Sequence, residues 1–223
     1  MTVTLGDTEQ AFAAARRIRA LGVRVVKVKV GYSSREDAAR VAAVVKAHPR
    51  AALTLDANQG YGPAQSLSLV RLLRARGIAP ILFEQPAEAD DLEGMASFHK
   101  KSGVPVAADE SLRGRADALA LARRGAAQVL NIKLMKLGML EAWDCALIAR
   151  AHGLGLMVGG MVETPLAMGA AAHVAAGLGG VRFVDLDTPL WLAENPTRGP
   201  GFGPGGVYDL SGVKAGIGVV PKP

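Results

Sequence analysis

The sequence of 223 residues has little of what marks disulfide-bonded or membrane proteins. A single cysteine, Cys145, excludes an internal disulfide and is typical of a reducing compartment. No charged segment followed by an apolar run opens the chain, and no apolar run is long enough to span a bilayer. We therefore predict a soluble, cytoplasmic protein that does not act in a membrane.

Aromatic residues are also scarce, at 4% of the chain, although 50% of the residues are hydrophobic. A core of this composition is built from Ala, Val, Leu and Ile, which suits parallel strands covered by alanine-rich helices. The formal net charge is +6, but the arginines are scattered along helical segments and are not interleaved with aromatics. This pattern predicts solvated helix faces and no nucleic-acid partner.

Eight β-branched runs recur along the chain, with starts about 20 to 30 residues apart, the length of one strand-plus-helix unit. We expect strands within residues 2–5, 23–31, 52–58, 81–86, 104–111, 129–136, 155–160 and 182–189. Helical segments lie between them, and several end at a glycine, as at Gly22, Gly77 and Gly125. The pattern predicts an α/β fold, a (β/α)8 TIM barrel.

The competing fold is an open doubly wound sheet, but no glycine-rich phosphate loop follows the first strand. We expect the barrel to occupy residues 1–190. Residues 191–223 are rich in glycine and proline and are expected to form an irregular C-terminal tail.

Carboxylates stand where three successive strands are expected to end, at Asp56, Glu84 and Asp109. A lone aspartate in such a position is more often a helix cap than a ligand. Three from neighbouring strands meet at the active-site face of a barrel, where unpaired buried charges are costly. Oxygen ligands of this kind suit Mg²⁺, and no histidine or cysteine accompanies them, which disfavours zinc.

Lysines accompany these carboxylates on two of the strands. Lys27 and Lys29 lie two apart and so on one face, and Lys133 and Lys136 lie at the sixth strand. We expect the two cations of the first pair to lower each other's pKa. A carbon acid held by Mg²⁺ between lysines on opposite sides of the barrel could lose and regain its α-proton, as in known sites that pair a lysine base with Mg²⁺.

The chain resembles the catalytic barrel of the enolase superfamily, in its muconate-lactonising subgroup, through five ordered motifs: "KVKVG", "LDANQG", "FEQP", "ADES" and "NIKLMKLG". The resemblance covers residues from about Thr2 to Pro189. It implies that Asp56, Glu84 and Asp109 hold one Mg²⁺ and that Lys29 and Lys133 are the acid and base. It also implies that Lys27 tunes Lys29 and contacts the substrate carboxylate.

Within the subgroup, "VDLDTP" resembles the Asp-x-Asp of the dipeptide epimerases, whose carboxylates bind a free α-ammonium. Asp185 and Asp187 are the matching residues, although Asp187 could instead cap the turn at Thr188. Further substrate contacts are implied for Gly160 and Val162, in "GGMVETP", and Thr2 could reach the same pocket. A serine is common at the position of Gly160, so one expected hydroxyl contact is missing.

The resemblance thus predicts a Mg²⁺-dependent epimerase of dipeptides such as L-Ala-D/L-Glu, acting by two-lysine proton transfer through a metal-stabilised enolate. The alternatives are a cycloisomerase, an o-succinylbenzoate synthase or an N-acylamino-acid racemase of the same subgroup, or an inactive barrel fragment that binds metal. Members of the family carry an N-terminal capping domain, and from Met1 onward we expect that domain to be absent. Apolar surface left uncovered by it could favour a homo-oligomer.

Overall fold

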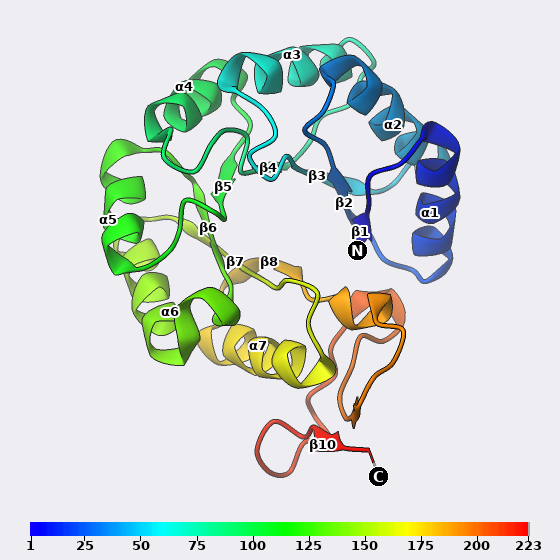
Figure 1. Cartoon of the computed structure of the whole chain (residues 1–223), viewed down its shortest axis with the longest axis vertical. Helices are drawn as coiled ribbons and strands as arrows, with labels where there is room; N and C mark the ends of the chain where they lie inside the picture. Colours follow the sequence, from blue (N-terminus) through cyan, green and yellow to red (C-terminus); the bar gives the residue numbers. More distant parts are fainter. Residues whose placement is uncertain (223) are drawn as a thin grey trace.

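Eight parallel strands follow one another around a ring, and helices surround it (Figure 1). The computed structural model describes residues 1–222. The strands are β1 (Thr2–Val3), β2 (Val25–Lys29), β3 (Ala52–Asp56), β4 (Leu82–Glu84), β5 (Val106–Ala108), β6 (Val129–Ile132), β7 (Gly155–Gly159) and β8 (Val181–Asp185). Each strand pairs in parallel with the next one along the chain, which confirms the predicted barrel.

Within residues 1–222, seven α-helices alternate with these strands and cover the outside of the ring (Figure 1). They are α1 (Thr8–Ala20), α2 (Ser34–Ala47), α3 (Pro63–Arg74), α4 (Leu92–Ser102), α5 (Arg115–Arg124), α6 (Leu134–Ala151) and α7 (Pro165–Leu178). The predicted glycine stops are confirmed, because Gly22, Gly77 and Gly125 all have positive φ angles just after a helix. Strand β8 is followed by the 3₁₀ helix η1 (Thr188–Trp191) in place of an eighth α-helix.

Residues 192–222 form short elements only: β9 (Thr197–Arg198), the 3₁₀ helix η2 (Pro204–Gly206) and β10 (Val220–Pro221). Strands β9 and β10 form an antiparallel pair. The tail is attached to the barrel by hydrogen bonds from Gly205 N to Leu21 O (2.8 Å) and from Tyr208 Oη to Leu186 O (2.8 Å). Part of the tail lies between α7 and α1, where the next helix of the ring would stand, and β10 lies further out from the ring (Figure 1).

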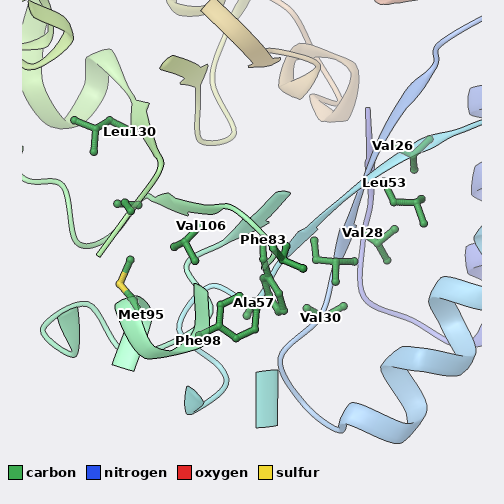
Figure 2. Packing of buried hydrophobic residues seen from close by; sticks show 14 of the residues in the cluster. Val26, Val28, Val30, Leu53, Ala57, Phe83, Met95, Phe98, Val106 and Leu130 are labelled. Carbon is green, nitrogen blue, oxygen red and sulfur yellow. The ribbon is translucent and has the colours of Figure 1, made fainter. Parts of the chain in front are cut away.

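Alternation along the strands divides the core into two parts. Every second residue packs outward against the helices, as Phe83 does against Phe98 of α4, with ring centroids 5.2 Å apart (Figure 2). The other residues fill the ring. A small buried cluster consists of Leu82, Ala107, Val129 and Met157, with Phe183 packed against it. Two positions further along β4 stands Glu84, so the apolar layer lies beneath the charged one.

The ring is joined differently between its first and last strands. Within residues 1–222, no backbone ladder pairs β8 with β1. Instead, the N–H of Thr2 donates to Asp187 Oδ2 (2.9 Å), and its hydroxyl donates to Asp185 Oδ1 (3.2 Å). Two side chains of the predicted site therefore hold this seam together.

Three arginines near helix ends donate hydrogen bonds to the carbonyls of neighbouring helices. Arg19 donates to Ala47 O at the end of α2 (3.4 Å), and Arg74 and Arg150 donate to the carbonyls of Ser102 and Leu178 at the ends of α4 and α7. Each cation lies at the negative end of the next helix around the ring, which is a favourable position. These arginines are structural, although the sequence indicated only that they were solvated.

A close approach between two loops fixes the identity of Gly31. Its φ is +125°, and a Cβ there would lie 2.7 Å from Ala57 O. We expect Gly31→Ala to destabilise the fold by about 1–3 kcal/mol, since both the backbone and the contact become strained. Gly177→Ala, inside α7 where a Cβ meets nothing within 4 Å, is the control and should stabilise by up to about 1 kcal/mol. Urea denaturation of both variants measures the difference, and equal effects would contradict this account.

Cys145 is fully buried in α6. Burial, with the charges of Glu141 and Asp144, raises the pKa of its thiol to about 11. At pH 8 only about one thiol in a thousand is then ionised in the native state. We expect a disulfide reagent to label the native protein at least about 100-fold more slowly than the urea-unfolded protein at that pH. Comparable rates would show that the thiol is accessible.

Candidate active site

The carboxyl ends of the strands bring the predicted acidic and basic residues together at one mouth of the barrel. Strands β3 and β4 end at Asp56 and Glu84, as predicted, and these two residues are register partners. Asp109 lies one residue beyond the end of β5. All three carboxylates are buried, with at most 3% of each residue exposed.

Two lysines on β2 point to the same carboxylate, which confirms that they share a face. Lys29 Nζ lies 2.6 Å and Lys27 Nζ lies 3.2 Å from Asp56 Oδ2. Lys27 also lies 3.4 Å from Glu84 Oε2 and forms an ion pair with Asp185. Lys27 is thus the central cation among three buried acids.

The expectation that Lys27 and Lys29 lower each other's pKa is wrong for Lys27. Burial lowers the pKa of this lysine, but the carboxylates of Glu84, Asp185 and Asp56 outweigh it and raise the pKa well above its usual value. The sequence showed the two neighbouring lysines, but the acids come from other strands. Their proximity to Lys27 depends on closure of the ring.

Lys133 stands on the other side of the mouth from Lys29. It follows the last residue of β6 and is the N-cap residue of α6, so the expectation that it lies within the strand is off by one position. Its Nζ lies 2.5 Å from Asp109 Oδ2 and 3.7 Å from the sulfur of Met161. Burial lowers the pKa of Lys133, but Asp109 and Glu84 together raise it above its usual value.

Lys136 supports the same carboxylate from the first turn of α6. Its Nζ lies 2.7 Å from Asp109 Oδ1 and 2.6 Å from Asp109 O. Burial alone would raise the pKa of Asp109, but Lys133 and Lys136 hold it below its usual range.

The acids influence one another strongly. Burial raises the pKa of Glu84 to about 8, and the neighbouring charges of Asp56 and Asp109 contribute to this rise while Lys27 opposes it. Asp185 is also buried, yet Lys27 brings its pKa down to about 2. The mouth therefore holds carboxylates close enough to repel one another, with lysines as their counterions.

Asp185 and Asp187 do not share the strand that the sequence predicted. Strand β8 ends at Asp185, and Asp187 is the N-cap residue of η1, with φ −82° and ψ 0°. Both nevertheless face Thr2 across the seam. The side chain of Asp187 makes no capping hydrogen bond, and its Oδ1 is buried without a partner among the described residues. The structure thus does not support the alternative role of Asp187 as a turn cap.

Gly160 and Val162 lie in the loop between β7 and α7, on either side of Met161, which touches Lys133. A Cβ at Gly160 would lie 2.5 Å from the terminal methyl group of Met168. The methionine therefore occupies the space into which a serine side chain would project at this position. Val162 is 68% exposed.

Three residues of the site were not predicted, although all three lie in motifs that the sequence displays. Asn131 donates to Glu84 Oε1 (2.7 Å), and Asn58 donates to Glu110 (3.3 Å). Gln85 accepts from Asp109 N (3.1 Å) and donates to Ser111 (2.8 Å). Asn131, Gln85 and Asn58 belong to "NIKLMKLG", "FEQP" and "LDANQG", and their strand-end positions were the available signal.

The mouth offers oxygen donors of the kind that a divalent cation binds. Within residues 1–222, no three histidine, cysteine or acidic side chains group closely enough to form a metal site, and lysines pair with the acids instead. The donor set nevertheless consists of hard oxygen ligands. In addition, Asn131 Oδ1 and Glu110 Oε2 are buried without partners among the described residues. These donors fit a hard cation such as Mg²⁺.

Eight parallel strands with acids and amines at their carboxyl ends form the arrangement of a catalytic (β/α)8 barrel. The chain belongs to the enolase C-terminal domain-like family, whose model matches residues 10–223. This confirms the resemblance drawn from the five motifs. No helix within residues 1–222 has the length and hydropathy needed to cross a membrane.

Two kinds of known protein are similar to this chain: dipeptide epimerases and a mandelate racemase/muconate lactonizing enzyme. The aromatic dipeptide epimerase of Herpetosiphon aurantiacus is 47% identical over 220 residues, which cover 98% of this chain and 62% of that protein. A mandelate racemase/muconate lactonizing enzyme from Roseiflexus sp. superposes with a TM-score of 0.96 at 49% identity, over 100% of this chain and 64% of that one.

The dipeptide epimerase of Enterococcus faecalis, solved with Mg and the dipeptide L-Leu-L-Tyr, superposes with a TM-score of 0.91 at 33% identity. The match covers 98% of this chain and 62% of that one. The chain thus spans less than two thirds of the length of each of these proteins.

Proposed function

We propose that this chain is the catalytic barrel of a Mg²⁺-dependent dipeptide epimerase. One observation carries the proposal: Lys29 and Lys133 lie on opposite sides of a buried carboxylate cluster, with the Asp185–Asp187 pair beside it. The dipeptide epimerases among its relatives support the substrate class. We expect substrates of the L-Ala-D/L-Glu type, with inversion at one α-carbon.

Asp56, Glu84 and Asp109 would hold one Mg²⁺, assisted by the unpartnered oxygens nearby. When bound, the cation would draw charge from the substrate carboxylate and make the α-proton more acidic. The lysines that now pair with these acids would be released toward the substrate. Lys29 would then hold or remove the proton on one face of the α-carbon and Lys133 on the other.

Lys27 would remain near the centre of the site, where it can bind the substrate carboxylate while still contacting Asp185. The free Oδ1 of Asp187, together with Asp185, would accept hydrogen bonds from the substrate ammonium group. Thr2 would position this pair through the two hydrogen bonds that it donates. The loop carrying Gly160 and Val162 would border the substrate beside Lys133.

Deuterium exchange tests the proposal directly. The full chain is incubated with Mg²⁺ in D₂O and a panel of L,L-dipeptides, and incorporation at the α-carbon is followed by NMR or mass spectrometry. Incorporation into dipeptides, removed by chelating the metal, is the expected result. If only N-acylated amino acids or muconate-type substrates react, the alternative activities of the subgroup replace the proposal. If nothing reacts although Mg²⁺ binds, the chain is an inactive metal-binding barrel.

We also propose that the chain works in the cytoplasm and associates with further copies of itself. The buried free thiol of Cys145 supports the first point. Helix α6 supports the second, because it exposes Leu140 at 84%, Leu147 at 48% and Trp143 at 44%. Light scattering with the Leu140→Glu variant tests self-association: the unsubstituted chain should show a larger mass than the variant.

A further inference from the structure

A pocket lies at the opposite end of the barrel from the acid–lysine mouth. Its volume is about 480 Å³, and it is formed where α1 and α2 end and where β2 and β3 begin. Its lining consists of Arg19, Gly22, Val23, Arg24, His48 and Arg50. This volume falls within the range of small-molecule sites.

The pocket is strongly and uniformly cationic. Arg19, Arg24 and Arg50 all line it, and no acidic residue does. None of these arginines forms an ion pair with a carboxylate among the described residues. Arg19 donates to Ala47 O, which fixes its guanidinium near the end of α2. Three arginines that line one pocket, without carboxylate partners among the described residues, favour an anion.

His48 supplies a second, independent indication of a ligand. The residue is only 7% exposed, and its Nε2 lies 2.8 Å from Val23 O. Because a carbonyl oxygen only accepts, Nε2 carries the hydrogen of this bond. The other ring nitrogen, Nδ1, is buried without a partner among the described residues. A buried polar atom left in this state is costly, so a bound group that reaches it gains free energy.

We propose that this pocket binds a phosphate group. Tetrahedral phosphate oxygens match the paired N–H donors of guanidinium groups, and a phosphate also carries a P–OH that can donate to a neutral imidazole nitrogen. Free phosphate and the phosphate of a small phosphomonoester share this chemistry. The site is separate from the acid–lysine mouth, and it does not depend on the proposed epimerase activity.

Calorimetric titration of the full chain tests the site, with inorganic phosphate and with methyl phosphate, at an ionic strength held constant with chloride. Saturable binding of one phosphate per chain is expected. The side chains of Arg24 and Arg50 make no hydrogen bond or ion pair among the described residues, so the double variant Arg24→Gln/Arg50→Gln should fold normally. It should bind phosphate at least tenfold more weakly.

The matched control is Arg123→Gln/Arg124→Gln, which removes the same charge from the end of α5 at the same face of the barrel. It should bind phosphate as the unsubstituted chain does. His48→Phe, which removes the unpartnered nitrogen, should weaken binding several-fold. Absence of saturable binding, or an equal loss in both double variants, would overturn the proposal. Tighter binding of methyl phosphate than of phosphate would identify a phosphomonoester as the occupant, and the reverse order would identify the free ion.

Discussion

Lys133→Ala and Lys29→Ala are each expected to lose epimerisation by about 10²- to 10⁴-fold, the usual contribution of one acid–base group. They should differ in which epimer still exchanges its α-hydrogen with D₂O. Lys29 comes from β2 and Lys133 from the end of β6, so under the proposed function each would reach one face of the α-carbon. A chain that keeps only one lysine should exchange only the epimer whose proton faces it.

The measurement is deuterium incorporation into the separate L,L and L,D dipeptides. Lys101→Ala, which changes an exposed lysine at the end of α4, is the control and should behave as the unsubstituted chain. Loss of exchange from both epimers in both variants would contradict the assignment of one lysine to each face. So would retention of full epimerisation by either variant.

Lys27→Met is expected to destabilise the fold by about 3–5 kcal/mol in the absence of divalent cations, because it leaves buried carboxylates without their shared counterion. Lys27 is 6% exposed and lies within 4 Å of acidic oxygens on Asp56, Glu84 and Asp185. Methionine fills a volume similar to that of lysine, so the loss of stability arises mainly from the missing charge and not from changed packing.

Urea denaturation at pH 7 measures this effect. Lys214→Met, at an exposed tail lysine with no ion pair among the described residues, should change the free energy of unfolding by less than about 0.5 kcal/mol. Mg²⁺ should recover part of the stability lost by Lys27→Met, since a cation held by the same acids replaces the missing charge. An unchanged stability of Lys27→Met would show that these acids are not mutually repelling.

The barrel could be predicted from the sequence because its repeating pattern is local. Strand runs and the helix stops at Gly22 and Gly77 need only neighbouring residues to be recognised. The strands ending at Asp56 and Glu84 were placed correctly for the same reason. Strand ends were less certain where a helix begins at once: Lys133 and Asp187 both fall just outside their strands as N-cap residues.

The contacts within the site could not be predicted, because they join residues from distant strands. Lys27 of β2 contacts Asp185 of β8 beside the seam at β1, and the carboxylates of Glu84, Asp185 and Asp56 raise the pKa of this lysine, whereas the sequence showed only the neighbouring lysine. The hydrogen bonds that Thr2 donates to Asp185 and Asp187 could not be predicted for the same reason. The hydrogen bond from Arg150 to Leu178 O at the end of α7 could not be predicted either, because it depends on how α6 and α7 pack in the folded chain.

The seam between β1 and β8 makes barrel closure and ligand binding thermodynamically linked. Asp185 and Asp187 bind Thr2 with some of their oxygens, and an ammonium ligand would bind the same two side chains. A ligand that strengthens the Thr2 hydrogen bonds stabilises the closed ring, and a ligand that competes with them destabilises it. In either case, closure of the ring changes the free energy of ligand binding by the same amount as the ligand changes the free energy of closure. A substitution at Thr2 should therefore alter affinity and hydrogen-exchange protection of β1 together, although its side chain need never touch the ligand.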